Sequence, residues 1–523
     1  MANRGGGRTR HQKLPAAGPA REGLRRKGQF WTPAWVADAM AAYVLGNGSD
    51  HLFDPAVGEG AFLRAGKAAA RELGRAVDLF GTELDPDVLT QAGQSGLTHA
   101  DLAGVHITDF VLSPPRRRFR AIVANPPYIR HHRLTADTKA ALKSFAESLT
   151  GSALDGRAGF HVYFLLRALT LLDAGGRLAF IVPADTCEGK FAPQLWEWIS
   201  ASYRLDAVLT FEHDASPFPG VDTNAVVLFI ENAPPGREFA WARCTSPETR
   251  QVKEWVISGF TRQSGAILLQ RRGVAEGIST GLSRPPVEDR SDAVALSDFA
   301  SVMRGIATGA NEFFYLTRDQ AEALGLPDEF LFPAVGRTRD VPGDAITEET
   351  LTALDKSGRP SLLFSPSGEA PEFFPEAMRA YLMRGEELGL HRRPLIATRK
   401  PWYKMETRPV PPILFAYLGR RNARFIRNFA GALPLTGFLC VYPHVNDPQY
   451  IERLWEVLKH PDTIKNLARV GKSYGAGAIK VEPRGLEKLP LPQAAILRSG
   501  LPHPGPRASA AGRDVGQGLL FVP

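Results

Sequence analysis

Residues 51–63 read HLFDPAVGEGAFL, an apolar run that passes through a glycine-rich turn into a helical pattern. Three further short apolar runs end at Gly, Asn or Pro: 78–81, 121–124 and 178–182. Helical patterns lie between the runs, as at 61–73 and 160–172. This alternation predicts an α/β fold in which helices cover both faces of a mostly parallel, doubly wound sheet. Ligands of such folds bind beyond the carboxyl ends of the strands, where the polar residues of this chain gather.

The pattern divides the chain into four segments. Residues 1–27 are rich in Gly, Arg, Pro and Ala without apolar periodicity, which predicts a basic, disordered tail. The alternating pattern fills residues 28–235 and ends in the segment 231–236, whose prolines and glycine predict a linker. Residues 236–497 are irregular and richer in Pro and charge, and we expect a second, mixed α/β domain there. Residues 498–523 resemble the first segment, and we expect a flexible tail.

Acidic residues follow the first three predicted strands. Asp54 opens the glycine-rich turn, in which Gly58 and Gly60 allow a ligand to approach the backbone closely. Glu83 lies 23 residues beyond Gly60, close to the offset at which an acid meets ribose hydroxyls in dinucleotide-binding folds. Asp109 ends the next extended run, where it could accept a hydrogen bond from an adenine amino group. Three such acids in register predict a nucleotide-like ligand at this edge of the sheet.

The run 121–124 leads directly into Asn125-Pro126-Pro127-Tyr128. Two prolines make this turn rigid, so the Asn125 carboxamide and the Pro126 carbonyl become fixed hydrogen-bond acceptors. An exocyclic amine has two hydrogens to donate, and two acceptors would draw it toward a tetrahedral geometry with its lone pair on an incoming methyl group. Tyr128 would offer a stacking surface for a base. The tetrapeptide therefore predicts methyl transfer to a planar amine or amide.

These motifs, in this order, resemble the gamma-class (TaqI-like) DNA adenine-N6 methyltransferases of type II restriction–modification systems. Residues 29–33, QFWTP, are similar to the N-terminal motif of that family. The resemblance implies a Rossmann-like class I methyltransferase domain at 28–235 that uses S-adenosylmethionine without a metal. It assigns these cofactor-binding residues: Thr32, Asp54, Gly58, Gly60, Glu83, Asp109 and Phe110. It assigns these catalytic residues: Asn125, Pro126 and Tyr128.

The segment 218–227, FPGVDTNAVV, is similar to the family segment whose phenylalanine stacks on the target adenine. The resemblance therefore implies that Phe218 and Tyr128 form the two faces of a sandwich around a flipped-out base. Flipping a base out of duplex DNA costs a few kcal/mol, which such stacking would offset. A core phenylalanine ahead of a strand is the structural alternative for Phe218.

The carboxy-terminal half resembles target-recognition domains more weakly, through the opening 304–311 and the closing segments 475–480 and 489–492. Between them, residues 391–427 hold ten Lys or Arg against one acid. Five aromatic residues are interleaved with these charges: Trp402, Tyr403, Phe415, Tyr417 and Phe425. Such a composition suits a surface that meets phosphates and stacks on bases, unless the aromatic rings face a core. We expect these DNA-binding residues: Arg399, Lys400, Lys404, Arg420, Arg421 and Arg424.

The composition of the chain constrains its cellular compartment and its binding partners. The terminal segments carry +7 and +2 of a net charge of +8, so the rest of the chain is close to neutral. No apolar run approaches the ~20 residues of a membrane span, and the three distant cysteines indicate a reducing compartment. We expect a cytoplasmic monomer that modifies double-stranded DNA without touching membranes. The 27 residues ahead of the first motif are too few for a nuclease domain, which indicates a separate cognate endonuclease or none.

Several alternatives remain open at this point. The same tetrapeptide serves methyltransferases that act on ribosomal RNA or on a protein glutamine, but these are usually much shorter after the catalytic domain. N4-cytosine methylation is chemically feasible, although that class tends to carry Ser in place of Asn125. A fourth alternative is an inactive subunit that only recognises DNA. The presence of Asp54, Glu83, Asp109 and Asn125 argues against it.

Overall fold

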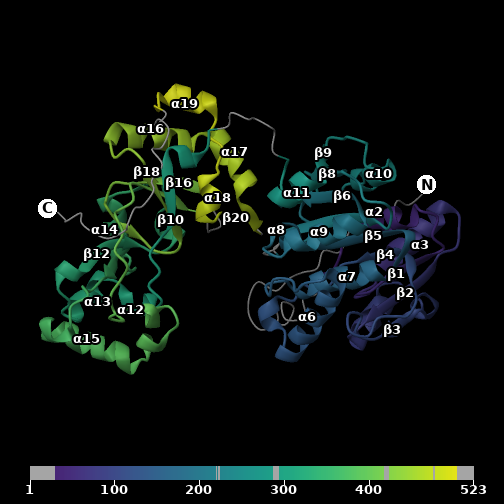
Figure 1. The fold of residues 1–523 in the computed structure, drawn as a ribbon, viewed down its shortest axis with the longest axis horizontal. Coiled ribbons are helices and arrows are strands. Elements are labelled where there is room, and N and C mark those ends of the chain that lie inside the picture. The colour runs from purple at the N-terminus through teal and green to yellow at the C-terminus, as the bar shows by residue number, and fades with distance from the viewer. Residues whose placement is uncertain are drawn as a thin grey trace, which may run out of the picture. The chain divides into compact units, whose positions relative to one another are not determined.

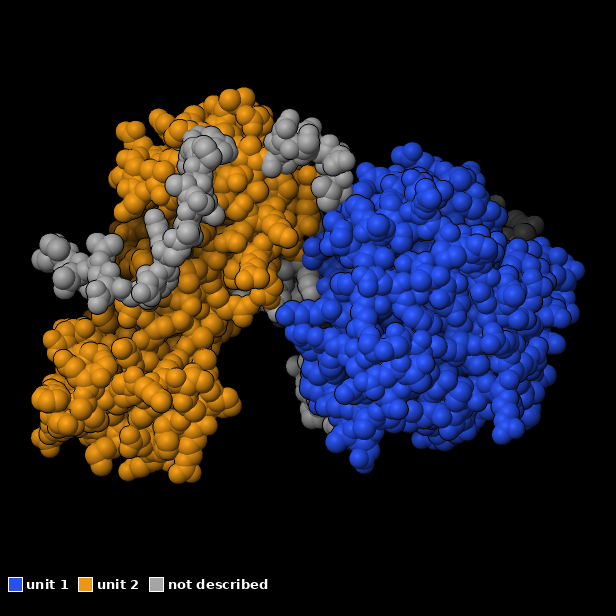
Figure 2. Space-filling model, viewed as in Figure 1, with its two compact units in different colours: residues 1–287, 474–476 blue, residues 288–473, 477–523 orange. Residues whose placement is uncertain are grey.

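A nine-stranded sheet forms the centre of the amino-terminal part of the chain. The protein is described here by a computed structural model, which defines residues 30–219, 221, 224–286, 294–416, 423–474 and 478–502. Two compact units are distinguished: unit 1 comprises residues 1–287 and 474–476, and unit 2 comprises residues 288–473 and 477–523 (Figure 2). The predicted tail at 1–27 lies outside the described residues.

The strands of the large sheet are arranged in the order β3-β2-β1-β4-β5-β7-β6-β8-β9 (Figure 1). The first five positions pair in parallel, whereas β7 is antiparallel to both β5 and β6. The strands have these bounds: β1 His51–Asp54, β2 Asp78–Glu83, β3 Val105–Ile107, β4 Phe119–Ala124, β5 Leu172–Pro183, β6 Arg204–Phe211, β7 Ala225–Glu231, β8 Glu238–Cys244 and β9 Ile267–Gly273. The mostly parallel, doubly wound sheet expected from the sequence is confirmed.

Helices cover both faces of this sheet, because alternate residues of its buried strands face opposite sides. On β4, Ile122 packs with α6, α7 and α9, whereas Ala121 and Val123 pack with α2, α3 and α10. The helices of unit 1 have these bounds: α2 Ala34–Leu45, α3 Ala61–Leu73, α4 Pro86–Gln94, α5 His99–Leu102, α6 Ala136–Thr150, α7 Phe160–Thr170, α8 Asp185–Glu188, α9 Ala192–Ser202, α10 Gln251–Ile257 and α11 Val274–Thr280. No helix of the described part of the chain is long and apolar enough to cross a membrane.

The predicted domain boundary at residue 235 is wrong. Residues 232–237 form a short turn, after which β8 pairs in parallel with β6 and in antiparallel with β9. These strands extend the sheet of unit 1, and the division between the units falls after Val287. A tight turn and a linker share the same Pro- and Gly-rich composition, so composition alone could not distinguish them.

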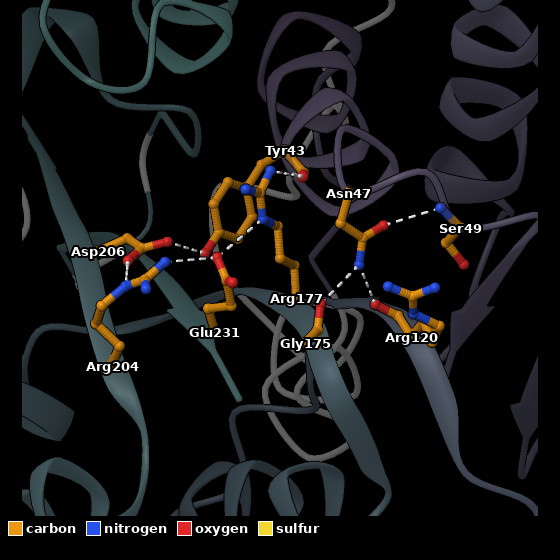
Figure 3. Close-up of polar contacts among 9 residues, drawn as sticks. All are labelled: Tyr43, Asn47, Ser49, Arg120, Gly175, Arg177, Arg204, Asp206 and Glu231. Carbon is orange, nitrogen blue, oxygen red and sulfur yellow. Dashed lines mark hydrogen bonds and ion pairs between the residues drawn. The ribbon is translucent and has the colours of Figure 1, made fainter. Parts of the chain in front are cut away.

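A polar cluster joins α2 to the middle of the sheet (Figure 3). Glu231 at the end of β7 accepts from Arg177 on β5 at 3.1 Å and from Arg204 on β6 at 2.7 Å. Asp206 accepts from Arg204 at 2.7 Å and from the Tyr43 hydroxyl at 2.6 Å. Burial, followed by the charge of Asp206, raises the pKa of Tyr43 well above its usual value. The cluster holds the carboxy-terminal end of α2, whose other end begins directly after residues 30–33.

Unit 2 is mixed α/β, as expected, and contains two main sheets with strand orders β10-β18-β15-β16-β13 and β11-β14-β12-β17. Its strands have these bounds: β10 Ala300–Arg304, β11 Tyr315–Leu316, β12 Leu331–Val335, β13 Ala345–Ile346, β14 Leu362–Phe364, β15 Ile413–Ala416, β16 Arg424–Asn428, β17 Leu433–Pro434, β18 Phe438–Pro443, β19 Lys472–Tyr474 and β20 Ala478–Lys480. Its helices have these bounds: α12 Asn311–Phe314, α13 Arg318–Ala323, α14 Glu348–Lys356, α15 Glu376–Glu387, α16 Pro448–Lys459, α17 Pro461–Val470, α18 Pro483–Glu487 and α19 Gln493–Ser499.

The predicted start of the carboxy-terminal tail at residue 498 is also wrong. Helix α19 extends to Ser499, and Leu501 is buried in the core beside α16. Arg453 donates to the Gly500 carbonyl at 3.0 Å. The apolar residues that anchor this end are too few to produce a visible periodicity in the sequence. The rest of the predicted tail, 503–523, lies outside the described residues.

Candidate active site

A cavity of about 920 Å³ lies at the carboxyl ends of β1, β2 and β4 in unit 1. This volume is within the usual range of small-molecule sites. Of the residues predicted to bind cofactor or target, these line it: Thr32, Gly58, Glu83, Asp109, Phe110, Asn125 and Phe218. Asp54, Gly60, Pro126 and Tyr128 are not part of its lining. Six separate segments of the predicted site therefore converge on one cavity.

Glu83 organises the glycine-rich turn. Its Oε2 accepts from the Gly58 backbone N–H at 2.9 Å, and its Oε1 accepts from the backbone N–H groups of Leu84 at 2.8 Å and Asp85 at 3.0 Å. A carboxylate offers about four acceptor sites, so these three bonds leave capacity for a ligand. Gly58 has a φ of +53°, and a Cβ there would lie 3.2 Å from the Trp31 ring. The turn thus depends on glycine at residue 58 and on the acid at residue 83.

Asp109 and Phe110 form another wall of the cavity. Asp109 Oδ1 accepts from the backbone N–H groups of Val111 and Leu112, both at 2.9 Å, which fixes the carboxylate and leaves Oδ2 to meet a ligand. The Phe110 ring lies 5.8 Å from Phe53 and 5.2 Å from Phe164, measured between ring centroids. A rigid apolar surface beside a held acceptor suits a purine that carries an amino group.

Asp54 and Gly60 occupy structural positions instead of the cavity wall. Asp54 is fully buried, and its Oδ1 accepts from the Ala56 N–H at 3.0 Å. Its Oδ2 has no hydrogen-bond partner among the described residues. Burial raises the pKa of Asp54 to about 8. Gly60 has a φ of +77°, and a Cβ there would lie 2.2 Å from Leu97 Cδ1, so glycine is required for packing.

The raised pKa of Asp54 predicts a pH-dependent stability. The folded pKa of about 8 exceeds the unfolded value of about 3.9, so the folded state holds the proton more tightly. Its contribution to stability is full below about pH 4 and is lost as the pH rises toward 8. In the wild type, this loss lowers the free energy of unfolding by at most about 1.4 kcal/mol per pH unit. Asp54→Asn should remove the loss, because the asparagine side chain does not titrate. Between pH 5 and pH 9, the melting temperature of the wild type should fall relative to that of the variant. Melting temperatures that change in parallel with pH would contradict the raised pKa of Asp54.

The Asn125 carboxamide is held from the amino-terminal segment. Its Nδ2 donates to the Phe30 carbonyl at 2.6 Å and to Thr32 Oγ1 at 3.1 Å. Because both amide hydrogens are used, Oδ1 is the group left to accept a hydrogen bond at the cavity wall. Thr32 was predicted to bind the cofactor; the structure adds a contact with the Asn125 amide. The two residues lie 93 positions apart, and no feature of the sequence could have revealed this contact.

Tyr128 and Phe218, the two residues predicted to stack on the target base, lie near each other in this structure with their rings almost perpendicular. The two rings are 6.5 Å apart and inclined by 87°, and the Phe30 ring lies 5.7 Å from Tyr128 and 6.1 Å from Phe218. The Tyr128 hydroxyl donates to the Ile181 carbonyl at 3.1 Å, and burial raises its pKa well above the usual value. Sequence reasoning missed Phe30, which packs against both predicted stacking rings.

The predicted DNA-binding residues of unit 2 fall into three groups. Arg399, Lys400 and Lys404 line a second cavity of about 440 Å³. Arg424 instead donates to the carbonyls of Val341 and Gly343, which gives it a structural position. Arg420, Arg421 and Tyr417 lie outside the described residues.

Of the five interleaved aromatic residues, the four that the structure describes do not form an exposed stacking surface. Tyr403, Phe415 and Phe425 are buried in the cores of unit 2, so the expectation that they stack on bases is wrong. Phe415 and Phe425 face each other across the β15–β16 pair. The Trp402 ring packs against Phe313 and Phe314, and its Nε1 donates to Glu386 at 3.0 Å. Packing of the strands, which local composition cannot reveal, turned these rings inward.

A sheet of this order, with a cavity at its carboxyl ends and Asn-Pro-Pro-Tyr beside it, defines a Rossmann-like methyltransferase. Residues 97–218 match the Eco57I restriction-modification methylase family, and residues 285–503 match the type II methyltransferase M.Eco57I, C-terminal domain. The chain is 24% identical over 477 residues to the type II methyltransferase M.AccI of Acinetobacter calcoaceticus, covering 89% of this chain and 85% of that protein. It is 25% identical over 488 residues to M.XamI of Xanthomonas campestris pv. amaranthicola, covering 91% and 86%.

Among solved structures, the chain is similar to the type IIL restriction-modification enzyme MmeI, solved in complex with DNA. The TM-score is 0.54 at 13% identity, over 90% of this chain and 64% of that chain, which supports the fold. Taken together, the two domain matches and the relatives show that the chain belongs to the type II restriction–modification DNA methyltransferases. The family resemblance expected from the sequence is confirmed at this level.

Proposed function

We propose that this protein transfers a methyl group from S-adenosylmethionine to N6 of an adenine within a specific sequence of double-stranded DNA. The observation that carries the proposal is the Asn125 amide, whose two donors are engaged by Phe30 and Thr32. That arrangement leaves Asn125 Oδ1 as a fixed acceptor for an amino hydrogen. Preorganised groups of this kind stabilise a transition state without reorganisation during the reaction.

The cavity residues fit S-adenosylmethionine. Glu83 retains acceptor capacity suited to ribose hydroxyls, and Asp109 with Phe110 offers an acceptor and an apolar surface suited to adenine. Trp31 and Gly58 line the same cavity, and the Trp31 ring lies 3.2 Å from the position that a Cβ at residue 58 would take. When bound, this cofactor supplies an electrophilic methyl group, and no metal is required.

The tetrapeptide supports an amine as the methyl acceptor. Asn125 Oδ1 and the Pro126 carbonyl would each accept one amino hydrogen and orient the nitrogen lone pair toward the cofactor. Tyr128, which is held by its hydrogen bond to the Ile181 carbonyl, would stack on one face of the flipped base. Phe218 lines the cavity and would cover another part of the base. We infer that the base displaces Phe30 from its contacts with these two rings.

The cysteines argue against methylation of a cytosine ring carbon. That chemistry needs a thiolate nucleophile at the base. Cys187, Cys244 and Cys440 are the three cysteines of the chain, all are buried, and none lines the cavity. Burial raises the pKa of each thiol, which disfavours the thiolate further. These features favour an exocyclic amine over C5 of cytosine.

We further propose that the protein acts as a cytoplasmic monomer that modifies DNA without cutting it, with any cognate nuclease on a separate chain. Unit 2 would read the target sequence. Expression in a host without DNA methylation, followed by single-molecule sequencing of its genome, tests the function. N6-methyladenine at one recurrent sequence is expected. Unmodified DNA from cells that contain the folded protein would direct attention to RNA or protein substrates.

Thr32 is expected to act as a positioning residue for Asn125. Thr32→Val removes the acceptor while keeping the shape of the side chain, and an unpaired buried amide donor costs about 1–3 kcal/mol. We therefore expect kcat to fall by about tenfold or more, whereas Thr32→Ser should retain most of it. The dissociation constant of S-adenosylmethionine should change little. A larger dissociation constant for S-adenosylmethionine with an unchanged kcat would instead assign Thr32 to cofactor binding alone.

A further inference from the structure

Unit 2 contains a small cavity with a strongly basic wall. Its volume is about 440 Å³, and its lining includes five cationic side chains and one acid: Arg304, Arg399, Lys400, Lys404, Arg408 and Glu406. Arg399, Lys400 and Lys404 are among the DNA-binding residues expected from the sequence, whereas Arg304 and Arg408 are not. Five cations around one hollow repel one another unless an anion neutralises them.

Arg399 is fixed within this cavity with a donor to spare. Its Nη2 donates to the Ala307 carbonyl at 2.6 Å, and its guanidinium lies 5.9 Å from the centroid of the Phe314 ring. Its Nη1 is buried and has no hydrogen-bond partner among the described residues. A buried guanidinium donor without a partner is costly, and an acceptor within the cavity would remove that cost.

Part of the cavity lining comes from the segment 304–311, RGIATGAN, which resembles the opening of a target-recognition domain and contributes Arg304, Gly305 and Ala307. A Cβ at Gly305 would lie 2.2 Å from the Leu435 carbonyl oxygen, and a Cβ at Gly309 would lie 2.8 Å from Ile396. Both glycines therefore allow close packing. This packing directs the Ala307 carbonyl to Arg399 and places Arg304 at the cavity, so the segment builds the site.

The remaining cations differ in their availability. Arg408 donates to the Arg304 carbonyl and, at 2.8 Å, to Glu406, while Arg304 pairs with Glu482. Lys400 and Lys404 are exposed, and neither has an ion-pair partner among the described residues. Two available ammonium groups beside a held guanidinium match the oxygens of a phosphate group.

We propose that this cavity binds one backbone phosphate of duplex DNA and thereby fixes the register of the recognition unit on its target. The inference rests on the proposed function, because it supplies a contact to the same substrate. Phosphate contacts position a protein on DNA without carrying sequence information. The cavity accordingly contributes affinity and register, and base-specific contacts come from other residues.

The test compares Lys400→Gln/Lys404→Gln with Lys356→Gln, an exposed lysine of unit 2 that does not line the cavity. Affinity for a labelled duplex is measured by fluorescence anisotropy over a range of salt concentrations. We expect the double variant to bind about tenfold more weakly, equally for cognate and unrelated duplexes, with a salt slope reduced by about 1. The Lys356→Gln control should bind like the wild type.

Other outcomes would overturn the proposal. A double variant with wild-type affinity and slope, alongside a wild type that binds DNA, would exclude the cavity while leaving the proposed function intact. Calorimetric binding of inorganic phosphate that is lost in the double variant, with unchanged DNA affinity, would mark a site for a free anion. A wild type that binds S-adenosylmethionine but no duplex would contradict both the cavity proposal and the DNA function.

Discussion

Asn125→Ala is expected to lower the rate constant of methyl transfer by about 10³-fold, the scale on which loss of one preorganised hydrogen-bonding group acts. The variant removes the Oδ1 acceptor and leaves the Phe30 carbonyl and Thr32 hydroxyl without their donor. Dissociation constants for S-adenosylmethionine and duplex DNA should change by only a few-fold. Single-turnover transfer with saturating DNA and cofactor measures the effect.

A matched amide provides the control for this experiment. Asn47 Nδ2 also bridges backbone groups, donating to the carbonyls of Arg120 at 2.9 Å and Gly175 at 3.3 Å, but Asn47 does not line the cavity (Figure 3). Asn47→Ala should reduce stability and leave the transfer rate per folded molecule unchanged. Substantial turnover by Asn125→Ala, or an equal loss in Asn47→Ala, would contradict the catalytic role of Asn125.

Glu83→Ala is expected to raise the dissociation constant of S-adenosylmethionine by about 10²-fold. The substitution removes the proposed ribose acceptor and frees the three N–H groups of Gly58, Leu84 and Asp85. Hydrogen bonds to a charged group are worth about 1.5–3 kcal/mol, and each 1.4 kcal/mol is a factor of ten. Calorimetric titration of the cofactor into each protein measures the change.

Two further variants define what the Glu83 result means. Glu83→Gln keeps one acceptor oxygen and should give an intermediate dissociation constant. Glu72→Ala removes an exposed acid on α3 that pairs with Lys253 outside the cavity, and it should bind the cofactor like the wild type. Unchanged affinity in Glu83→Ala would exclude the ribose contact and leave Glu83 with only its backbone role.

The sequence predicted the parts of the fold that depend on local periodicity. The expected helix at 61–73 corresponds to α3, and the runs at 51–53 and 121–124 correspond to β1 and β4. Turn glycines indicate a backbone conformation that other residues rarely adopt, and the period of the apolar residues indicates which face of an element is buried. The strand-end residues Glu83, Asp109 and Asn125 follow from the same logic, since parallel strands bring their carboxyl ends together.

The features that the sequence could not reveal depend on distant contacts. The bond between Asn125 and Thr32 joins segments that are separated in the sequence by four strands, β1 to β4. The Phe30 ring contacts the ring of Phe218, which lies beyond β6 in the sequence. Composition suggested an exposed aromatic surface in unit 2, but strand pairing buries Phe415 and Phe425. Lys400 lines a cavity, whereas Arg424 donates to backbone carbonyls, and tertiary packing alone decides between these two positions.

The proposed role of Asn125 is to direct a methyl group to the exocyclic amine of adenine. Purified protein should be incubated with duplex DNA and isotopically labelled S-adenosylmethionine, and the DNA should then be digested and its nucleosides identified by mass spectrometry. With the wild-type protein, the label is expected in N6-methyladenine. With Asn125→Ala, the rate of labelling should be about 10³-fold lower. Label in N4-methylcytosine or 5-methylcytosine, or in none of the nucleosides, would contradict it.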